Sequence, residues 1–279
     1  MPGNQTTFRW QMNTDGPETY EQIMVPVWMA DWVDDLLAAG NVGPGTRVLD
    51  TACGTGIVAR RAASVIGQGG RIAALDFNEG MLRVAQRCAA QERALNIEWY
   101  RNDVTKMPFP AGEFDTVLCN QGLQFFPDKP AALREMARVL APDGHLVLTV
   151  WGRPEKSPHV PVICDVFSHY FGKESTAMFK VACSLSDHSL LHDLVEGAGF
   201  TDIRIRADTK IARHPSLASL LPAYFSIFPI AEKIGAMPED ERNAMFSSIM
   251  AGLAAYTEGD GLAVPTEGII LTADIGVRE

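Results

Sequence analysis

The sequence has few cysteines and no long apolar run. Its five cysteines are scattered, without the paired spacing of a metal site or a disulfide framework. We therefore expect a reduced, cytoplasmic protein with no metal centre. Residues 1–10 are polar and lack the apolar core of a secretory signal peptide. No apolar run approaches the length needed to cross a bilayer, so no membrane span is expected.

Basic charge is also scarce. The chain of 279 residues carries 24 basic and 34 acidic side chains, which gives a formal net charge of −10. An acidic surplus repels phosphate, and no basic run is interleaved with aromatic residues, so nucleic acid is not an expected partner. Hydrophobic residues make up 47% of the chain, enough to bury the core of a single domain over 1–279.

Between residues 45 and 151, short apolar strands alternate with helical segments. Strands are expected at Arg47–Asp50, Arg71–Asp76, Ile97–Arg101, Phe114–Asn120 and His145–Trp151, with helices at Ile57–Ile66, Glu79–Ala94 and Lys129–Leu140. This alternation is typical of an α/β fold. We expect a Rossmann-like, doubly wound, mostly parallel seven-stranded sheet that is covered on both faces.

The remaining segments are more helical. Glu18–Ala39 predicts two helices that are interrupted at Pro26. Segments 153–186 and 213–265 are helical but irregular, and strands are expected at Ile203–Ala207 and Ile269–Ile275. Because the two helical segments are too long to be plain connections, we expect them to form a substrate roof over the site. The alternative is extra core packing or the interface of a homodimer.

A small-residue turn follows the first expected strand. Gly54 and Gly56 lack the Cβ atoms that would keep a ligand from the backbone. The sequence from Gly54 to Ala59 fits the loose dinucleotide pattern, and Asp76 follows about twenty residues later, as in NAD-dependent oxidoreductases. Asp50 argues against this alternative, because a carboxylate just before the turn would repel a pyrophosphate.

Three acids end three successive strands. Asp50, Asp76 and Asp103 suit a ligand with an amine, a ribose diol and a base that carries an exocyclic amino group. S-adenosylmethionine has these parts and no phosphate. The chain here resembles the class I S-adenosylmethionine-dependent methyltransferases, in the branch of the ubiquinone/menaquinone-biosynthesis C-methyltransferases. The resembling segments are 48–56, 75–82, 102–104, 114–120 and 132–148.

The resemblance implies a cofactor-binding core at 45–151, with S-adenosylmethionine as the cofactor. It assigns Asp76 to the ribose hydroxyls, Asp103 and Val104 to the adenine edge, and Asp50 to the methionine end. The full set of expected cofactor-binding residues is Tyr20, Asp50, Ala52, Cys53, Gly54, Asp76, Phe77, Met81, Asp103, Val104, Asn120 and Gln121. Ala52 replaces the family's usual first glycine, and we expect it to adopt a negative φ.

Each acid also has a structural alternative. Asp50 would cap the following turn, Asp76 would cap the next helix unless Asn78 does so, and Asp103 would be an exposed turn residue. We expect the substrate pocket to include Trp28 from the first helical stretch. Its other expected members are Gln124, Phe125 and His169.

The expected function is methyl transfer to carbon or oxygen of a small, fairly apolar acceptor, either a quinone precursor or a secondary metabolite. Methyl transfer depends mainly on placement of the reactants, since the sulfonium is a strong leaving group. His159 and His169 are candidates for a general base, but the sequence identifies neither of them as catalytic. A protein that binds S-adenosylmethionine without turnover is the non-enzymatic alternative.

Overall fold

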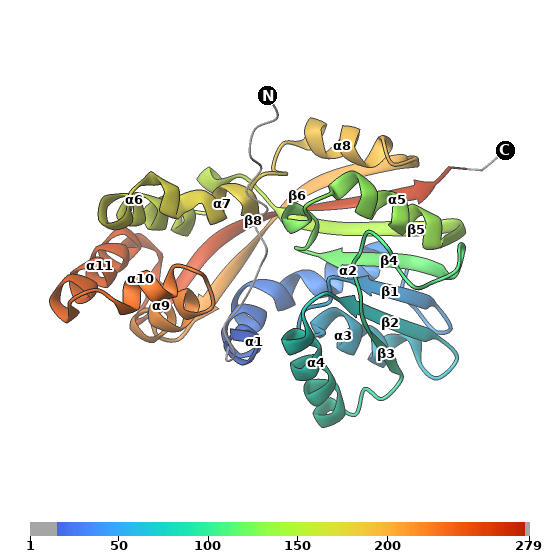
Figure 1. Cartoon of the computed structure of the whole chain (residues 1–279), viewed down its shortest axis with the longest axis horizontal. Helices are drawn as coiled ribbons and strands as arrows, with labels where there is room; N and C mark the ends of the chain where they lie inside the picture. Colours follow the sequence, from blue (N-terminus) through green and yellow to red (C-terminus); the bar gives the residue numbers. More distant parts are fainter. Residues whose placement is uncertain (1–15, 277–279) are drawn as a thin grey trace.

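The computed structural model describes residues 16–276, which fold around one eight-stranded mixed sheet (Figure 1). The expectation about a signal peptide falls on 1–10 and lies outside the described residues. The strand order is β3-β2-β1-β4-β5-β8-β6, and β7 pairs with β8 off this path. The strands are β1 (Arg47–Thr51), β2 (Arg71–Asp76), β3 (Ile97–Arg101), β4 (Phe114–Asn120), β5 (Leu140–Trp151), β6 (Phe200–His214), β7 (Thr257–Glu258) and β8 (Gly261–Ile275).

The first five strands run parallel, and β8 runs antiparallel to β5, β6 and β7. The expected Rossmann-like, mostly parallel α/β sheet is therefore confirmed. The count of seven strands is wrong, because the short β7 adds an eighth. Strand order reverses between β1 and β4, so the carboxyl ends of these strands leave a crevice where ligands bind in such sheets.

Helices cover both faces of the sheet (Figure 1). One apolar cluster packs α2, α3 and α4 on one face, and a second packs α5 and α8 on the other. Each of these helices buries an apolar stripe, as an amphipathic helix on a sheet must. The bounds are α2 (Val33–Ala39), α3 (Ile57–Ile66), α4 (Glu79–Glu92), α5 (Lys129–Val139) and α8 (His188–Glu196).

The chain does not break at Pro26, contrary to expectation. It runs through α1 (Gly16–Thr19), the π-helix η1 (Tyr20–Met29) and the 3₁₀ turn η2 (Ala30–Trp32) into α2. Pro26 lies inside η1. Proline has no backbone N–H to donate to the carbonyl four residues earlier, as an α-helix requires. Around Pro26 the chain instead forms the wider turns of a π-helix, whose hydrogen bonds span five residues.

Strands β6 and β8 are each 15 residues long, much longer than the expected Ile203–Ala207 and Ile269–Ile275. β5 ends at Trp151, opposite Gly268, and the other two strands continue as a ribbon to the pair His214 and Leu262. The sequence hides this extension because its β6 half is largely polar and exposed. The expected helical segment 213–265 therefore begins and ends within strands.

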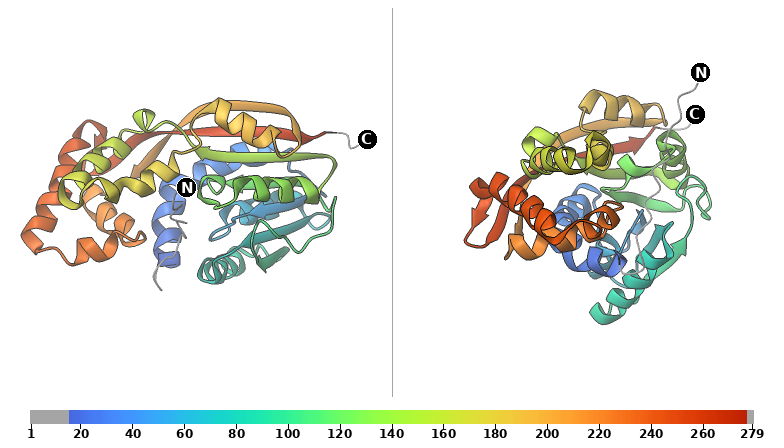
Figure 2. Two further views of the ribbon diagram at one scale, coloured as in Figure 1. Left: turned by 45° about the horizontal axis from the view of Figure 1, so that its top comes forward. Right: turned by 60° about the vertical axis from the view of Figure 1, so that its left-hand side comes forward.

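A third apolar cluster covers the extended ribbon and includes part of η1. Figures 1 and 2 show the helices of this cluster gathered at one end of the molecule, around β6 and β8. They are α6 (His159–Phe171), α7 (Ala177–Ala182), α9 (Leu217–Ser226), α10 (Ala231–Gly235) and α11 (Glu239–Gly252). The remaining 3₁₀ turns of the described residues are η3 (Leu123–Phe125), η4 (Pro154–Lys156), η5 (Lys173–Thr176) and η6 (Ala254–Tyr256). Within residues 16–276, no helix is long and apolar enough to cross a membrane.

Close packing at Gly268 yields a stability prediction. A Cβ atom at Gly268 would lie 2.5 Å from the ring of Trp32, which is 1% exposed. We expect Gly268→Ala to lower the free energy of unfolding by about 1–3 kcal/mol, because the buried ring has no room to move. Urea denaturation measures this change.

The matched control is Gly235→Ala in α10, where an added Cβ meets nothing within 4 Å. Alanine is the better helix former, so this variant should be neutral or more stable by roughly 1 kcal/mol. Equal losses in both variants would contradict the packing argument.

Candidate active site

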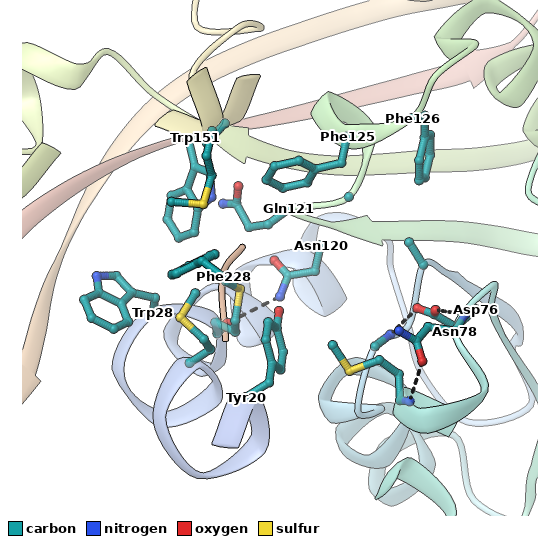
Figure 3. A pocket seen from close by; sticks show the side chains of 18 of the residues that line it. Tyr20, Trp28, Asp76, Asn78, Asn120, Gln121, Phe125, Phe126, Trp151 and Phe228 are labelled. Atoms are coloured by element: carbon teal, nitrogen blue, oxygen red, sulfur yellow. Dashed lines mark hydrogen bonds between the residues drawn. The ribbon is translucent and has the colours of Figure 1, made fainter. Parts of the chain in front are cut away.

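A cavity of about 350 Å³ opens at the carboxyl ends of β1, β2 and β4 (Figure 3). Its walls come from the turns after these strands, the loop after β3, the helix η1, and α6, α7, α9 and β8. Figure 3 shows Asp76 and Asn78 at one side and Trp28 at the other, with Tyr20 and Asn120 between them. The cavity thus joins a polar end beside the parallel strands to an apolar end beneath the helices.

The turn after β1 is left-handed at three positions. Ala52 has a φ of 53°, Gly54 of 55° and Gly56 of 83°. The expected negative φ at Ala52 is wrong, because the turn requires the conformation that glycine adopts most easily. The left-handed conformation costs an L-residue other than glycine about 1–2 kcal/mol. At Gly56 a Cβ would lie 2.7 Å from the ring of Trp99, so this position also needs glycine for space.

Asp76 joins two turns at the polar end. Its Oδ2 accepts the Gly54 N–H at 2.8 Å, and its Oδ1 accepts the Asn78 N–H at 2.8 Å. Burial raises the pKa of Asp76, while these backbone N–H groups act in the opposite direction. The Asn78 side chain caps α4 by accepting the N–H groups of Gly80 and Met81, so Asp76 is not the N-cap.

Asp50 lies behind the turn rather than in the cavity wall. Its Oδ2 accepts the N–H of Ala59 in α3 at 3.1 Å, and its Oδ1 has no hydrogen-bond partner. Burial is the main cause that raises the pKa of Asp50 to about 8, with a further rise from nearby Asp76. The carboxyl therefore supports the start of α3 and stays largely protonated at neutral pH.

Tyr20 is held beside the glycine turn by a buried ion pair. Arg60 of α3 donates to Glu21 at 2.7 Å and to the carbonyl of Thr55 at 3.0 Å, and its side chain is 2% exposed. Burial, together with the negative charges of Asp76 and Glu21, raises the pKa of Tyr20. Its neutral ring thus forms a wall between the two ends of the cavity.

Thr149 organises the turn after β4. Its hydroxyl donates to Asn120 Oδ1 at 2.6 Å and accepts the Gln121 N–H at 3.0 Å. The amide of Asn120 also donates to the carbonyl of Met29 at 3.4 Å. Gln121 is held at a φ of 56°, a second non-glycine residue in the left-handed region of the cavity wall.

Phe77 and Asp103 border the outer rim of the polar end. Phe77 lines the cavity and is 61% exposed. Asp103 is exposed, and its Oδ1 accepts the N–H and the hydroxyl of Thr105. The residue therefore does form an exposed turn, which was the structural alternative to cofactor binding. It also lines the cavity, together with Val104.

The apolar end is rich in aromatic rings. The Trp28 ring lies 4.7 Å from that of Tyr224 and 6.1 Å from that of His159, centroid to centroid. Tyr224 in turn lies 4.9 Å from Phe228. Burial lowers the pKa of His159 to about 4, so its imidazole is uncharged at neutral pH.

The described lining of the cavity lacks Lys and Arg side chains and contains buried polar atoms without hydrogen-bond partners. Among the described residues, no Lys or Arg lines the cavity, and Asp76 and Asp103 are its carboxylates. Several buried polar atoms of the lining have no hydrogen-bond partner, each at a cost of about 1–3 kcal/mol. They belong to Trp28, Gln121, His159 and Thr266.

Most of the residues expected from the sequence line this one cavity. They are Tyr20, Trp28, Ala52, Gly54, Asp76, Phe77, Met81, Asp103, Val104, Asn120, Gln121 and Phe125. Four expected residues do not line it: Asp50, Cys53, Gln124 and His169. Cys53 and Gln124 are buried behind the turns, where Gln124 donates to the Gln121 carbonyl, and His169 is exposed on α6.

Some lining residues escaped the sequence analysis. The sequence marks His159 only as a candidate base, and nothing in the local pattern distinguishes Tyr224, Phe228 or Thr266 from core or strand residues. Thr149 lies behind the lining, and its one signal in the sequence is a lone hydroxyl within an apolar strand. Among residues 16–276 one group has metal-ligand spacing, His192, Asp193 and Glu196 on α8, and it does not line the cavity.

The chain is similar in sequence to known methyltransferases. A methyltransferase domain family matches residues 48–144. The ubiquinone/menaquinone biosynthesis C-methyltransferase of Ectopseudomonas mendocina is 36% identical over 50% of this chain and 55% of its own length. The demethylmenaquinone methyltransferase of Listeria welshimeri is 32% identical over 62% of this chain and 78% of its own length. The chain thus spans about half the length of some curated relatives and more of others.

A solved structure is similar over most of the chain. It is phosphoethanolamine N-methyltransferase 2 of Haemonchus contortus, in complex with phosphomonomethylethanolamine and S-adenosylhomocysteine. The TM-score is 0.60 at 17% identity, covering 95% of this chain and 58% of that one, which shows the fold alone. From the sequence matches, the chain belongs to the class I S-adenosylmethionine-dependent methyltransferases, in the branch of the ubiquinone/menaquinone C-methyltransferases.

The buried Asp50 carboxyl predicts a pH-dependent stability difference. Between about pH 4 and pH 8 the folded protein keeps this proton while the unfolded chain releases it, so ionisation lowers stability as pH rises. Asp50→Asn removes the titration and retains an oxygen for the Ala59 N–H. We expect the free energy of unfolding of the variant, relative to the native protein, to increase from pH 5 to pH 8. A difference that is independent of pH would contradict the assignment.

Proposed function

We propose that the protein transfers the methyl group of S-adenosylmethionine to a carbon or oxygen atom of a small, fairly apolar acceptor. The cavity with two unlike ends carries this proposal. Its polar end adjoins the strand edge that binds ligands in doubly wound sheets, and its apolar end is lined by aromatic side chains. Such a division suits a polar cofactor and an apolar acceptor that meet between the two ends.

The residues of the polar end fit the cofactor. Asp76 uses one lone pair of each oxygen for backbone N–H groups, which leaves both oxygens able to accept a ribose hydroxyl. Phe77 and Met81 would flank the adenine, and Asp103 with Val104 would take its edge. The absence of Lys and Arg from the described lining suits a cationic ligand without phosphate. It favours S-adenosylmethionine over a dinucleotide, as the family does.

Asn120, Gln121 and Tyr20 lie between the two ends, so we assign them to the methionine arm. Asp50 does not line the cavity, and we assign it a supporting role beneath the turn. When bound, the cofactor supplies a methyl group on a sulfonium, a strong leaving group. The contribution of the chain is to align the acceptor and to exclude water.

The substrate roof is the second part of this proposal. Helices α6, α7 and α9 contribute His159, Phe179 and Tyr224 to the apolar end, and most of the remaining lining there is apolar. A quinone precursor is one acceptor class that fits, and the names of the curated relatives support it. An apolar secondary metabolite fits the same lining. No catalytic base is assigned, because an imidazole with a pKa of about 4 takes up a proton poorly.

Removal of the Asp76 charge tests the cofactor assignment. We expect Asp76→Asn to weaken binding of S-adenosylhomocysteine by about 1–3 kcal/mol, because a charged hydrogen bond is lost. Isothermal titration calorimetry measures the affinity, and thermal unfolding reports whether the turn stays folded.

Asp187→Asn is the matched control. Asp187 caps α8 outside the cavity, and asparagine caps helices equally well. This variant should bind like the native protein. Unchanged affinity in Asp76→Asn would refute the ribose assignment.

Turnover separates an enzyme from a silent binding protein. Candidate quinols, phenols and apolar secondary metabolites are incubated with S-adenosylmethionine, and the release of S-adenosylhomocysteine is measured. We expect acceptor-dependent release together with weak or absent NAD(H) binding. Cofactor binding without release for any acceptor would favour the silent alternative.

A further inference from the structure

Four buried residues that line the cavity each contain a polar side-chain atom without a hydrogen-bond partner. The atoms are Trp28 Nε1, Gln121 Nε2, His159 Nδ1 and Thr266 Oγ1. These residues are 7%, 5%, 7% and 3% exposed, respectively. Buried polar groups in folded proteins are almost always paired, so a cluster of exceptions around a cavity indicates that a ligand provides the partners.

Three of these residues belong to one wall of the cavity. The rings of Trp28 and His159 lie 6.1 Å apart, and they come from η1 and the first turn of α6. Thr266 lies on β8 just before Glu267, whose N–H donates to Ser157 Oγ at 3.0 Å, two residues before His159. Separate elements therefore bring three side chains with hydrogen-bonding groups, an indole, an imidazole and a hydroxyl, to the lining of the apolar end.

These groups are uncharged, and so are their surroundings in the cavity. Burial keeps the pKa of His159 low, which leaves its ring neutral at pH 7. The described lining contains no Lys or Arg to pair with a carboxylate or a phosphate. Its acid Asp76 lies on the side opposite Trp28 in Figure 3, so an ammonium group at the apolar end lacks this counter-charge.

We propose that Trp28, His159 and Thr266 form a subsite that binds a hydroxyl or carbonyl oxygen of an uncharged acceptor. Because Trp28 lies away from the cofactor end, the anchored oxygen is distinct from the atom that receives the methyl group. Gln121, at the centre of the cavity, provides a further amide donor for a second polar group. The inference rests on the proposed function, since it assumes that the acceptor occupies the apolar end.

The experiment uses the full-length protein saturated with S-adenosylhomocysteine at pH 7. Four probes share one ring system: naphthalene, 2-naphthol, 2-naphthoate and 2-naphthylmethylammonium. Calorimetry should show that 2-naphthol binds about tenfold more tightly than naphthalene, as one additional hydrogen bond allows, and that both ions bind more weakly than naphthalene. Equal or tighter binding of either ion, no preference for the hydroxyl, or no binding of any probe overturns the proposal.

A matched pair of variants locates the subsite. Thr266→Val removes the hydroxyl while it preserves the shape, and should reduce the affinity for 2-naphthol about fivefold without changing that for naphthalene. Thr272→Val, on the same strand but outside the cavity lining, should change neither affinity. Equal loss of both probes in Thr266→Val would indicate packing alone and overturn the subsite.

Before the probes are added, the native protein is titrated with S-adenosylhomocysteine. This first titration distinguishes a failure of the proposed function from a failure of the oxygen subsite. Failure of the native protein to bind it would refute the proposed function. Normal binding without a preference for 2-naphthol would refute the oxygen subsite and leave the proposed function standing.

Discussion

The Asp76 carboxylate is the contact on which the cofactor end depends. It accepts one backbone N–H from the turn after β1 and another from the turn after β2, so both turns share one anchor. Parallel pairing of β1 with β2 brings the two turns to the same edge of the sheet. The ligand-facing loops are thus fixed by main-chain hydrogen bonds to a single side chain. Such preorganised contacts need little rearrangement when a ligand binds.

The parallel half of the fold was predictable from the sequence, because the apolar runs and helical spacing of single segments agree there with the strand–helix alternation of the whole fold. The bounds of β2, β3, β4 and α3 match the expected ranges, and Asn78 caps α4. The ribbon of β6 and β8 was underestimated, since its outer half is held by pairing and by helices far away in sequence. For the same reason, nothing local marks Thr266 as a cavity residue. His169 lies exposed on α6, where helical spacing alone cannot tell a lining face from a surface face.

Two residues of the cavity wall adopt conformations that favour glycine. Ala52 and Gln121 both have positive φ and follow the neighbouring strands β1 and β4. Strained backbone persists where surrounding contacts determine it, and here Thr149 accepts the Gln121 N–H through its hydroxyl. Both residues line the cavity. This strain is concentrated where the proposed methionine arm and acceptor meet.

The extended ribbon has a consequence for where the cavity wall can move. Beyond Trp151, β8 pairs with β6 on one side and with the short β7 on the other, rather than with the parallel strands. The third apolar cluster packs on that part of the ribbon and includes residues of η1, α6, α9 and α11. A transient local unfolding of this cluster would break no hydrogen bond within the parallel strands. Motion within this cluster would therefore leave the nucleoside-facing edge of the sheet in its native geometry.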